Sequence, residues 1–292
     1  MTPLGLLAML AIGADPMPVA PTPCELGYCT PRVPPRWMPR SAVDQMKAKA
    51  EALLVVGKVP PGGPSFLYRP AFAEDQIIRL PARPYDFQPG DIVLSADGSK
   101  FWLMMHKLAL TSHPTHSMIV FAMPDGRPAI LEGGPHDTFK CRLLEVVPHL
   151  ASYEAEGRVW VRRRTCPLTP MQSARLTEFC LAVNCRDFSV RRLAVQLTPL
   201  RTRGLVRTAF IGKPNGLDRE AFYCSELVVE ACVYAGLLDK SSARPSATFP
   251  RDLFFGDSPN PYLHKHLPAM NCVWDAPARW TGHPIEPCSS KP

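Results

Sequence analysis

The sequence predicts a mixed α+β fold in which a small antiparallel sheet, or half-barrel, packs on helices. Short apolar strand patterns gather between residues 92 and 163, and turn residues separate them closely enough for hairpins. Two strongly helical patterns follow later in the chain. An order of strands first and helices afterwards is typical of α+β proteins, because alternating β/α proteins interleave the two.

Proline separates the ends of the chain from its centre. The chain has 292 residues and 34 prolines, and several prolines fall in the first 40 and the last 35 positions. Such segments are extended and have no burial pattern. We therefore expect a signal peptide at 1–14, a proline-rich linker at 15–40, a flanking helix and connection at 41–83, the main domain at 84–275 and a C-terminal tail at 276–292.

The N-terminus bears on the compartment. An apolar run from Leu4 to Ile12 precedes the small residues Gly13 and Ala14, which is the pattern of a signal-peptide core and cleavage site. The run is about half as long as a membrane span requires. We expect export to the periplasm or cell envelope. A cytoplasmic location is the alternative, because no Lys or Arg precedes the run.

The predicted elements follow in chain order. A helix begins near Ser41 and ends near Gly57, and a Pro-Gly turn at 89–90 leads into a strand at 92–94. The segment 101–110 is an amphipathic helix candidate. Further strands are expected at 116–122, 129–132, 140–147 and 157–163, the first two forming a hairpin. Helices are expected at 169–184 and from Tyr223 to Gly236, whereas 188–199 is ambiguous.

The net charge of +7 favours an anionic surface such as cell wall or membrane. Much of the excess comes from arginines at 162–164, 191, 192, 201, 203 and 207. No aromatic residues are interleaved with them as base stacking requires, so we expect no nucleic-acid partner and interpret them as a solvated basic face.

Cys224 is the candidate nucleophile. It stands at the start of the last strong helix, where free amide groups and the helix dipole favour a thiolate. His116, at the start of a strand, is the candidate base, and Glu132 on the paired strand is placed to orient it. His113, His136 and Asp137 are less constrained alternatives. Taken singly, each has an ordinary structural interpretation, and only the arrangement points to catalysis.

Four segments carry a resemblance to a known family. They are Gly90-Asp91-Ile92-Val93, Thr115 to Val120, Leu131-Glu132 and Tyr223 to Val228. Together they resemble the permuted branch of the NlpC-type papain-like hydrolases, the YiiX- and YaeF-like proteins related to lecithin retinol acyltransferase. In that branch the cysteine helix follows the histidine strand, as it does here. Met118 departs from the pattern, in which a small residue is usual.

The resemblance implies a circularly permuted papain-like fold and a catalytic site of Cys224, His116 and Glu132. Tyr223 and Ser225 are then expected at the oxyanion or substrate-binding site, without a cofactor. The implied activity is cleavage of an amide or ester bond in a cell-wall peptide or a lipid-like substrate through an acyl-enzyme. A phospholipid-dependent acyltransferase and an inactive binding protein of the same fold are alternatives. A metal site of His264 and His266, on one face of an expected strand, with a distant cysteine or His283 is a weaker one, because no third ligand is defined by spacing.

Overall fold

The computed structural model describes residues 65–69, 71, 82–96, 100–134, 138–196, 198, 200–210, 212–267 and 270–283. The predicted signal peptide, the linker, the helix near 41–57 and the alternatives His136 and Asp137 lie outside these residues. Within them, no helix is long and apolar enough to span a bilayer.

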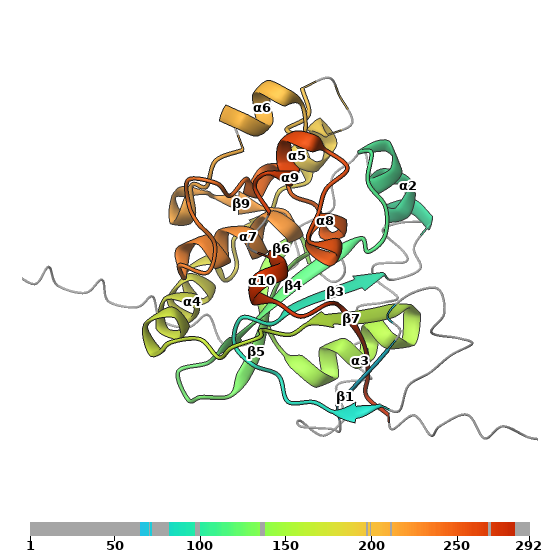
Figure 1. Cartoon of the computed structure of the whole chain (residues 1–292), viewed down its shortest axis with the longest axis vertical. Coiled ribbons are helices and arrows are strands. Elements are labelled where there is room, and N and C mark those ends of the chain that lie inside the picture. The colour runs from blue at the N-terminus through green and yellow to red at the C-terminus, as the bar shows by residue number, and fades with distance from the viewer. Residues whose placement is uncertain are drawn as a thin grey trace, which may run out of the picture.

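A ten-stranded sheet organises the domain (Figure 1), with the strand order β2-β1-β10-β7-β3-β4-β5-β6-β8-β9. All neighbouring strands are antiparallel except the pair β8 and β9. The strands are β1 (Phe66–Tyr68), β2 (Arg83–Pro84), β3 (Ile92–Ala96), β4 (His116–Ala122), β5 (Pro128–Gly134), β6 (Lys140–Glu145), β7 (Arg158–Arg162), β8 (Asp187–Phe188), β9 (Ala221–Phe222) and β10 (Ala278–Thr281).

The α-helices are α2 (Lys100–Leu108), α3 (Val146–Glu156), α4 (Pro170–Val183), α5 (Val190–Val195), α6 (Leu205–Phe210), α7 (Cys224–Tyr234), α8 (Pro250–Phe255), α9 (Pro261–His264) and α10 (Met270–Val273). Two 3₁₀ turns are η2 (Gly216–Asp218) and η3 (Pro245–Ala247). The α+β prediction is therefore confirmed, but the sheet is larger than the small one expected. Strands β1 and β10 also join it from outside the range 84–275.

The largest difference from the sequence prediction is α3. A strand was expected over 140–147, whereas β6 ends at Glu145 and a helix begins at once. The apolar residues Val146, Leu150 and Tyr153 recur at helical spacing and are buried. A proline at position 148 is tolerated because the first helical turn does not need its amide hydrogen. The segment after 188 proves to hold a short helix, α5.

The central strand β4 is covered on both faces. Ile119 and Phe121 point into one core, which α4 and α7 complete. Met118 and Val120 point into a second core, which α3 completes (Figure 1). Because successive side chains of a strand alternate between faces, His116 at the start of β4 is on the face of Met118.

Candidate functional site

Cys224 is the first residue of α7, separated by one residue from the end of β9. Its thiol is free, and the residue is 7% exposed. The amide groups of the first helical turn have no acceptor within the helix, so their hydrogens and the positive end of the helix dipole lie near the sulfur. This is the helix-start position that the sequence predicts.

His116 lies beside Cys224 and contacts two acid-base partners. Its imidazole is hydrogen-bonded to the thiol of Cys224. Its Nε2 is 2.7 Å from Oε1 of Glu132, which leaves Nδ1 for the sulfur. Burial alone would lower the pKa of His116, but Cys224 and Glu132 outweigh it and raise that pKa to about 10. The imidazolium is therefore the stable form at neutral pH.

Glu132 reaches His116 from the neighbouring strand. Met118 is opposite Glu132 in the β4–β5 register, so His116 is its diagonal neighbour on the same face, a distance that long side chains span. Burial would raise the pKa of Glu132, but the two imidazoles of His149 and His116 lower it well below its usual range. Glu132 is thus a buried carboxylate held charged by its neighbours.

Two residues of α3 complete this cluster, and the sequence prediction missed both. His149 Nε2 is 2.7 Å from Oε2 of Glu132, a close electrostatic contact rather than a well-directed hydrogen bond. The hydroxyl of Tyr153 donates to Oε1 of the same carboxylate. The Tyr153 ring also stacks on His116, with centroids 5.7 Å apart and planes 14° apart. The sequence signal for these two residues is the four-residue spacing of His149 and Tyr153. That spacing places them on one face only if the segment is a helix.

Gly134 is a third residue that the prediction missed. A Cβ at this position would lie 2.9 Å from Cε1 of His116 and 3.5 Å from Oε1 of Glu132. The first distance is too short for any real side chain, so glycine is required for the imidazole to approach β5 this closely. The sequence signal is the glycine pair that directly follows Glu132.

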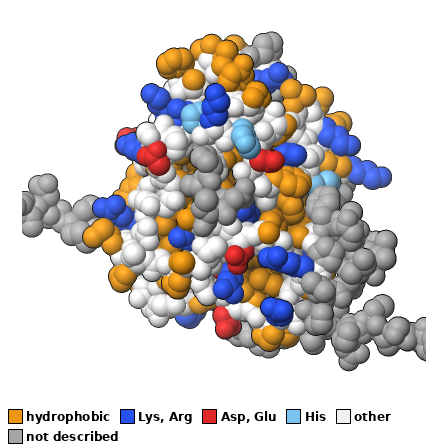
Figure 2. Space-filling view, in the orientation of Figure 1, with side chains coloured by type: hydrophobic (Ala, Val, Ile, Leu, Met, Phe, Trp, Pro, Cys, Tyr) orange, Lys and Arg blue, Asp and Glu red, His pale blue; other side chains and the backbone are white. Residues whose placement is uncertain are grey.

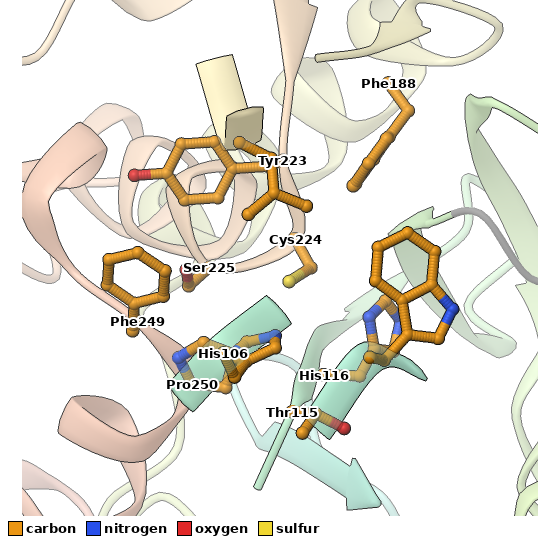
Figure 3. A pocket seen from close by; sticks show the side chains of 11 residues that line it. His106, Thr115, His116, Phe188, Tyr223, Cys224, Ser225, Phe249 and Pro250 are labelled. Atoms are coloured by element: carbon orange, nitrogen blue, oxygen red, sulfur yellow. The ribbon is translucent and has the colours of Figure 1, made fainter. Parts of the chain in front are cut away.

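A narrow pocket with a cavity volume of about 30 Å³ opens at Cys224. Figure 3 shows the cysteine at its centre, with His106, Thr115 and His116 opposite Tyr223 and Ser225. The lining is largely apolar and aromatic. It consists of Trp102, His106, Thr115, His116, Phe188, Leu193, Tyr223, Cys224, Ser225, Phe249 and Pro250. Such a lining suits an apolar substrate part with a few polar groups that orient it.

His106 is the second histidine of the pocket and was not predicted. It lies near the end of α2, is 5% exposed and meets the Phe249 ring edge to face. Its ring is hydrogen-bonded to the backbone carbonyl of Thr115. Among the described residues, its Nδ1 has no hydrogen-bond partner. Burial, together with the nearby imidazoles of His116 and His113, lowers the pKa of His106 to about 3. His106 is therefore neutral.

Tyr223 and Ser225 flank the cysteine, but their hydroxyls are engaged elsewhere. Tyr223 donates to the carbonyl of Ser246. Ser225 Oγ donates to the carbonyl of Thr248 at 2.7 Å. Both bonds fasten the start of α7 to the segment around η3. Both residues line the pocket. Because their hydroxyls already donate to backbone carbonyls, these hydroxyls are not the donors to an oxyanion. The expected role of Tyr223 and Ser225 in oxyanion or substrate binding stays a prediction.

Glu226, which follows Ser225 in the sequence, fixes the start of α7 through ion pairs. Its carboxylate is completely buried and lies 2.9 Å from both Arg192 and Arg219. It also accepts a hydrogen bond from the amide of Tyr223 at 3.4 Å. Arg219 reaches Glu230, one turn along the helix, at 3.2 Å. This network holds the helix start in place without lining the pocket.

The remaining candidates do not join the site. Gly90, at φ +91°, forms the predicted turn, and Asp91 is buried there as an acceptor for the amides of Gln88 and Arg164. Within the described ranges, no three His, Cys, Asp or Glu side chains gather as metal ligands. The strand expected around His264 is wrong, because that residue ends α9.

The fold and the site define an α+β protein in which Cys224, His116 and Glu132 contact one another in that order beside an apolar pocket. The chain is similar in structure to the metalloprotein YiiX from Escherichia coli O157:H7, with a TM-score of 0.35 and 19% identity over 52% of this chain and 67% of that one. No family model and no curated protein matches the sequence.

Proposed function

We propose that this protein is a thiol hydrolase of the permuted papain-like type, cleaving an amide or ester bond through an acyl-enzyme. The observation that carries the proposal is the position of His116, hydrogen-bonded to Cys224 on one side and 2.7 Å from Glu132 on the other. A nucleophile, a base and a residue that orients the base are the parts that thiol catalysis requires. All three are buried, and Cys224 and His116 line a pocket for substrate.

The reaction follows from these roles. His116 holds the proton of Cys224, and the thiolate sulfur attacks the substrate carbonyl carbon. The carbon–nitrogen or carbon–oxygen bond then breaks, and the leaving group takes the proton from His116. His116 next removes a proton from water, whose oxygen attacks the thioester. The acid leaves, and the proton returns to the sulfur of Cys224.

The start of α7 supports the charged intermediate. The backbone amide of Cys224 is unpaired within the helix and adjoins the sulfur. A donor of this kind contributes about 3 kcal/mol when aimed at a developing oxyanion. Because the hydroxyls of Tyr223 and Ser225 donate to backbone carbonyls, the amide is the donor that we assign to this role.

The pocket favours substrates with an apolar acyl part. Trp102 of α2, Leu193 of α5 and Phe249 just before α8 line it. His106 adds a neutral acceptor, so a substrate N–H or O–H near the scissile bond would satisfy its Nδ1. A phospholipid-dependent acyltransferase is the second candidate, favoured by the same apolar lining. It shares the acyl-enzyme and differs in the group that accepts the acyl chain.

Trapping the intermediate tests the proposal. The full-length protein is incubated separately with labelled phospholipid and with peptidoglycan fragments, and intact-mass spectrometry then locates any thioester. We expect an acyl adduct on Cys224 and none in Cys224→Ala. The matched control is Cys166→Ala, which removes an exposed free thiol that does not line the pocket. Undiminished turnover in Cys224→Ala contradicts the proposal, and an adduct passed to a non-water acceptor identifies the transferase.

A further inference from the structure

A basic segment surrounds α6 and was interpreted from the sequence as a solvated face. Between residues 188 and 217 there are six Lys and Arg residues and no Asp or Glu. The structure divides the six into two groups. Arg192 and Arg203 turn inward, where they pair with buried carboxylates at 2.9 Å and 2.6 Å. The others lie at the surface, exposed or half-buried: Arg191, Arg201, Arg207 and Lys213.

Large apolar side chains are exposed in the same segment. Phe210 is 70% exposed and Val206 64%, more than most large hydrophobic residues of the described chain, and Leu205 and Leu200 exceed 50%. We call Leu200, Leu205, Val206 and Phe210, with Arg201, Arg207 and Lys213, the α6 patch. Figure 2 shows hydrophobic side chains gathered at the top of the molecule, where Figure 1 places α6, with Lys and Arg side chains beside them.

The α6 patch is held in place by buried hydrogen bonds. Thr208, on the inner side of α6, is completely buried and donates to the carbonyl of Thr202 at 3.0 Å. Asn260 donates to the carbonyl of Arg203 at 2.8 Å. Asn260 precedes α9, which packs beside α6 and adds the exposed Tyr262 and Lys265. The apolar side chains are thus presented outward by an ordered element.

We propose that the α6 patch docks this protein on a membrane surface that carries anionic lipids. Apolar side chains enter the boundary between headgroups and acyl chains, and neighbouring Lys and Arg residues meet the lipid phosphates. All charged residues of the α6 patch are positive, and this charge complements an anionic bilayer. A nucleic acid fits less well, because the patch offers aliphatic residues instead of a series of aromatic rings for stacking.

Docking of this kind would bring the pocket near the bilayer. The segment of the α6 patch adjoins α5, because the amide of Thr202 donates to Oε1 of Gln196 at the end of α5 at 3.1 Å. Leu193 of α5 lines the pocket of Cys224. Membrane binding does not depend on the thiol chemistry. A Cys224→Ala variant should bind vesicles as the parent protein does, which separates this inference from the proposed function.

Vesicle co-sedimentation of the full-length protein tests the inference. The probes are vesicles of phosphatidylcholine alone and vesicles with 30% phosphatidylglycerol. We expect binding to the anionic vesicles only, weakened by 0.5 M salt. Phe210→Asp should lower the partition coefficient about ten-fold, because it replaces an inserted ring by a charge. Arg207→Gln should lower it about five-fold, since one basic contact is lost.

The matched control is Met171→Asp. Met171 is 67% exposed on α4, outside the α6 patch, and should tolerate the same change without loss of binding. Circular dichroism of each variant checks that the fold is intact. The inference is overturned if the parent protein does not bind anionic vesicles, or if Phe210→Asp and Met171→Asp lose binding equally. It is also overturned if Phe210→Asp changes only self-association or DNA binding.

Discussion

Glu132 shares its two carboxylate oxygens between the imidazoles of two histidines. Oε1 is 2.7 Å from His116 Nε2, and Oε2 is 2.7 Å from His149 Nε2. The carboxylate therefore joins the β4–β5 hairpin to α3 and orients His116 toward the cysteine at the same time. Because the cluster is buried, losing one member leaves the others with unpaired charge or polarity.

Glu132→Gln should slow turnover and shift its pH dependence. The carboxylate helps to raise the pKa of His116 to about 10, so its removal lowers that pKa. His116 must keep its proton to protonate the leaving group, and activity falls as pH rises through its pKa. The alkaline limb of the pH–rate profile should therefore move to lower pH by about one unit or more, each unit being about 1.4 kcal/mol.

The control for this change is Glu145→Gln, an exposed carboxylate at the end of β6. It should leave both the rate and the alkaline limb in place. An unmoved limb in Glu132→Gln, in protein that remains folded, would show that Glu132 does not act through His116.

Alkylation should distinguish Cys224 from the other thiols. The imidazole of His116 is hydrogen-bonded to the Cys224 thiol and is placed to accept its proton, and the thiolate is the form that reacts. Cys141, Cys180 and Cys232 are buried, and burial raises the pKa of each. In a Cys166→Ser background, we expect iodoacetamide at pH 6 to modify Cys224 at least about ten times faster than those three, because an ordinary thiol is almost wholly protonated there.

Peptide mass spectrometry over time gives the rate at each site. His116→Asn should slow the modification of Cys224 at pH 6 about ten-fold or more, since the positive partner is lost. Equal rates with and without the imidazole would mean that His116 does not activate Cys224.

How much of the site could be predicted depended on local periodicity. His116 and Glu132 were predicted because a two-residue period and a tight turn define which side chains share a face of a hairpin. His149 and Tyr153 were missed because β6 passes into α3 without a Gly or Asn to mark the boundary. The two-residue strands β2, β8 and β9 leave no readable pattern, which is why the sheet was expected to be smaller.

Gly134→Ala should impair the site while leaving the rest of the fold in place. The added methyl would lie 2.9 Å from His116 Cε1, so the imidazole must move away from Glu132 or from Cys224. We expect kcat to fall about ten-fold or more, because a displacement near 1 Å at reacting groups costs up to about a hundred-fold. Gly204→Ala is the control, since its new methyl would meet nothing closer than 3.8 Å. Equal kcat in the two variants would contradict the placement of the imidazole.

His106 should contribute to substrate selection through its unpartnered Nδ1. An acceptor buried without a partner destabilises the free pocket, and a substrate N–H or O–H that reaches it recovers that free energy. His106→Phe keeps an aromatic ring beside Phe249 but removes both the acceptor and the donor to the Thr115 carbonyl, whereas His106→Asn places a polar atom near the position of Nδ1. We expect His106→Phe to raise KM about five- to ten-fold for amide substrates, as loss of one neutral hydrogen bond implies. Matched esters without a donor should be unaffected. Partial recovery in His106→Asn distinguishes this role from simple packing, and an equal loss for amides and esters would assign His106 to the structure of the pocket instead.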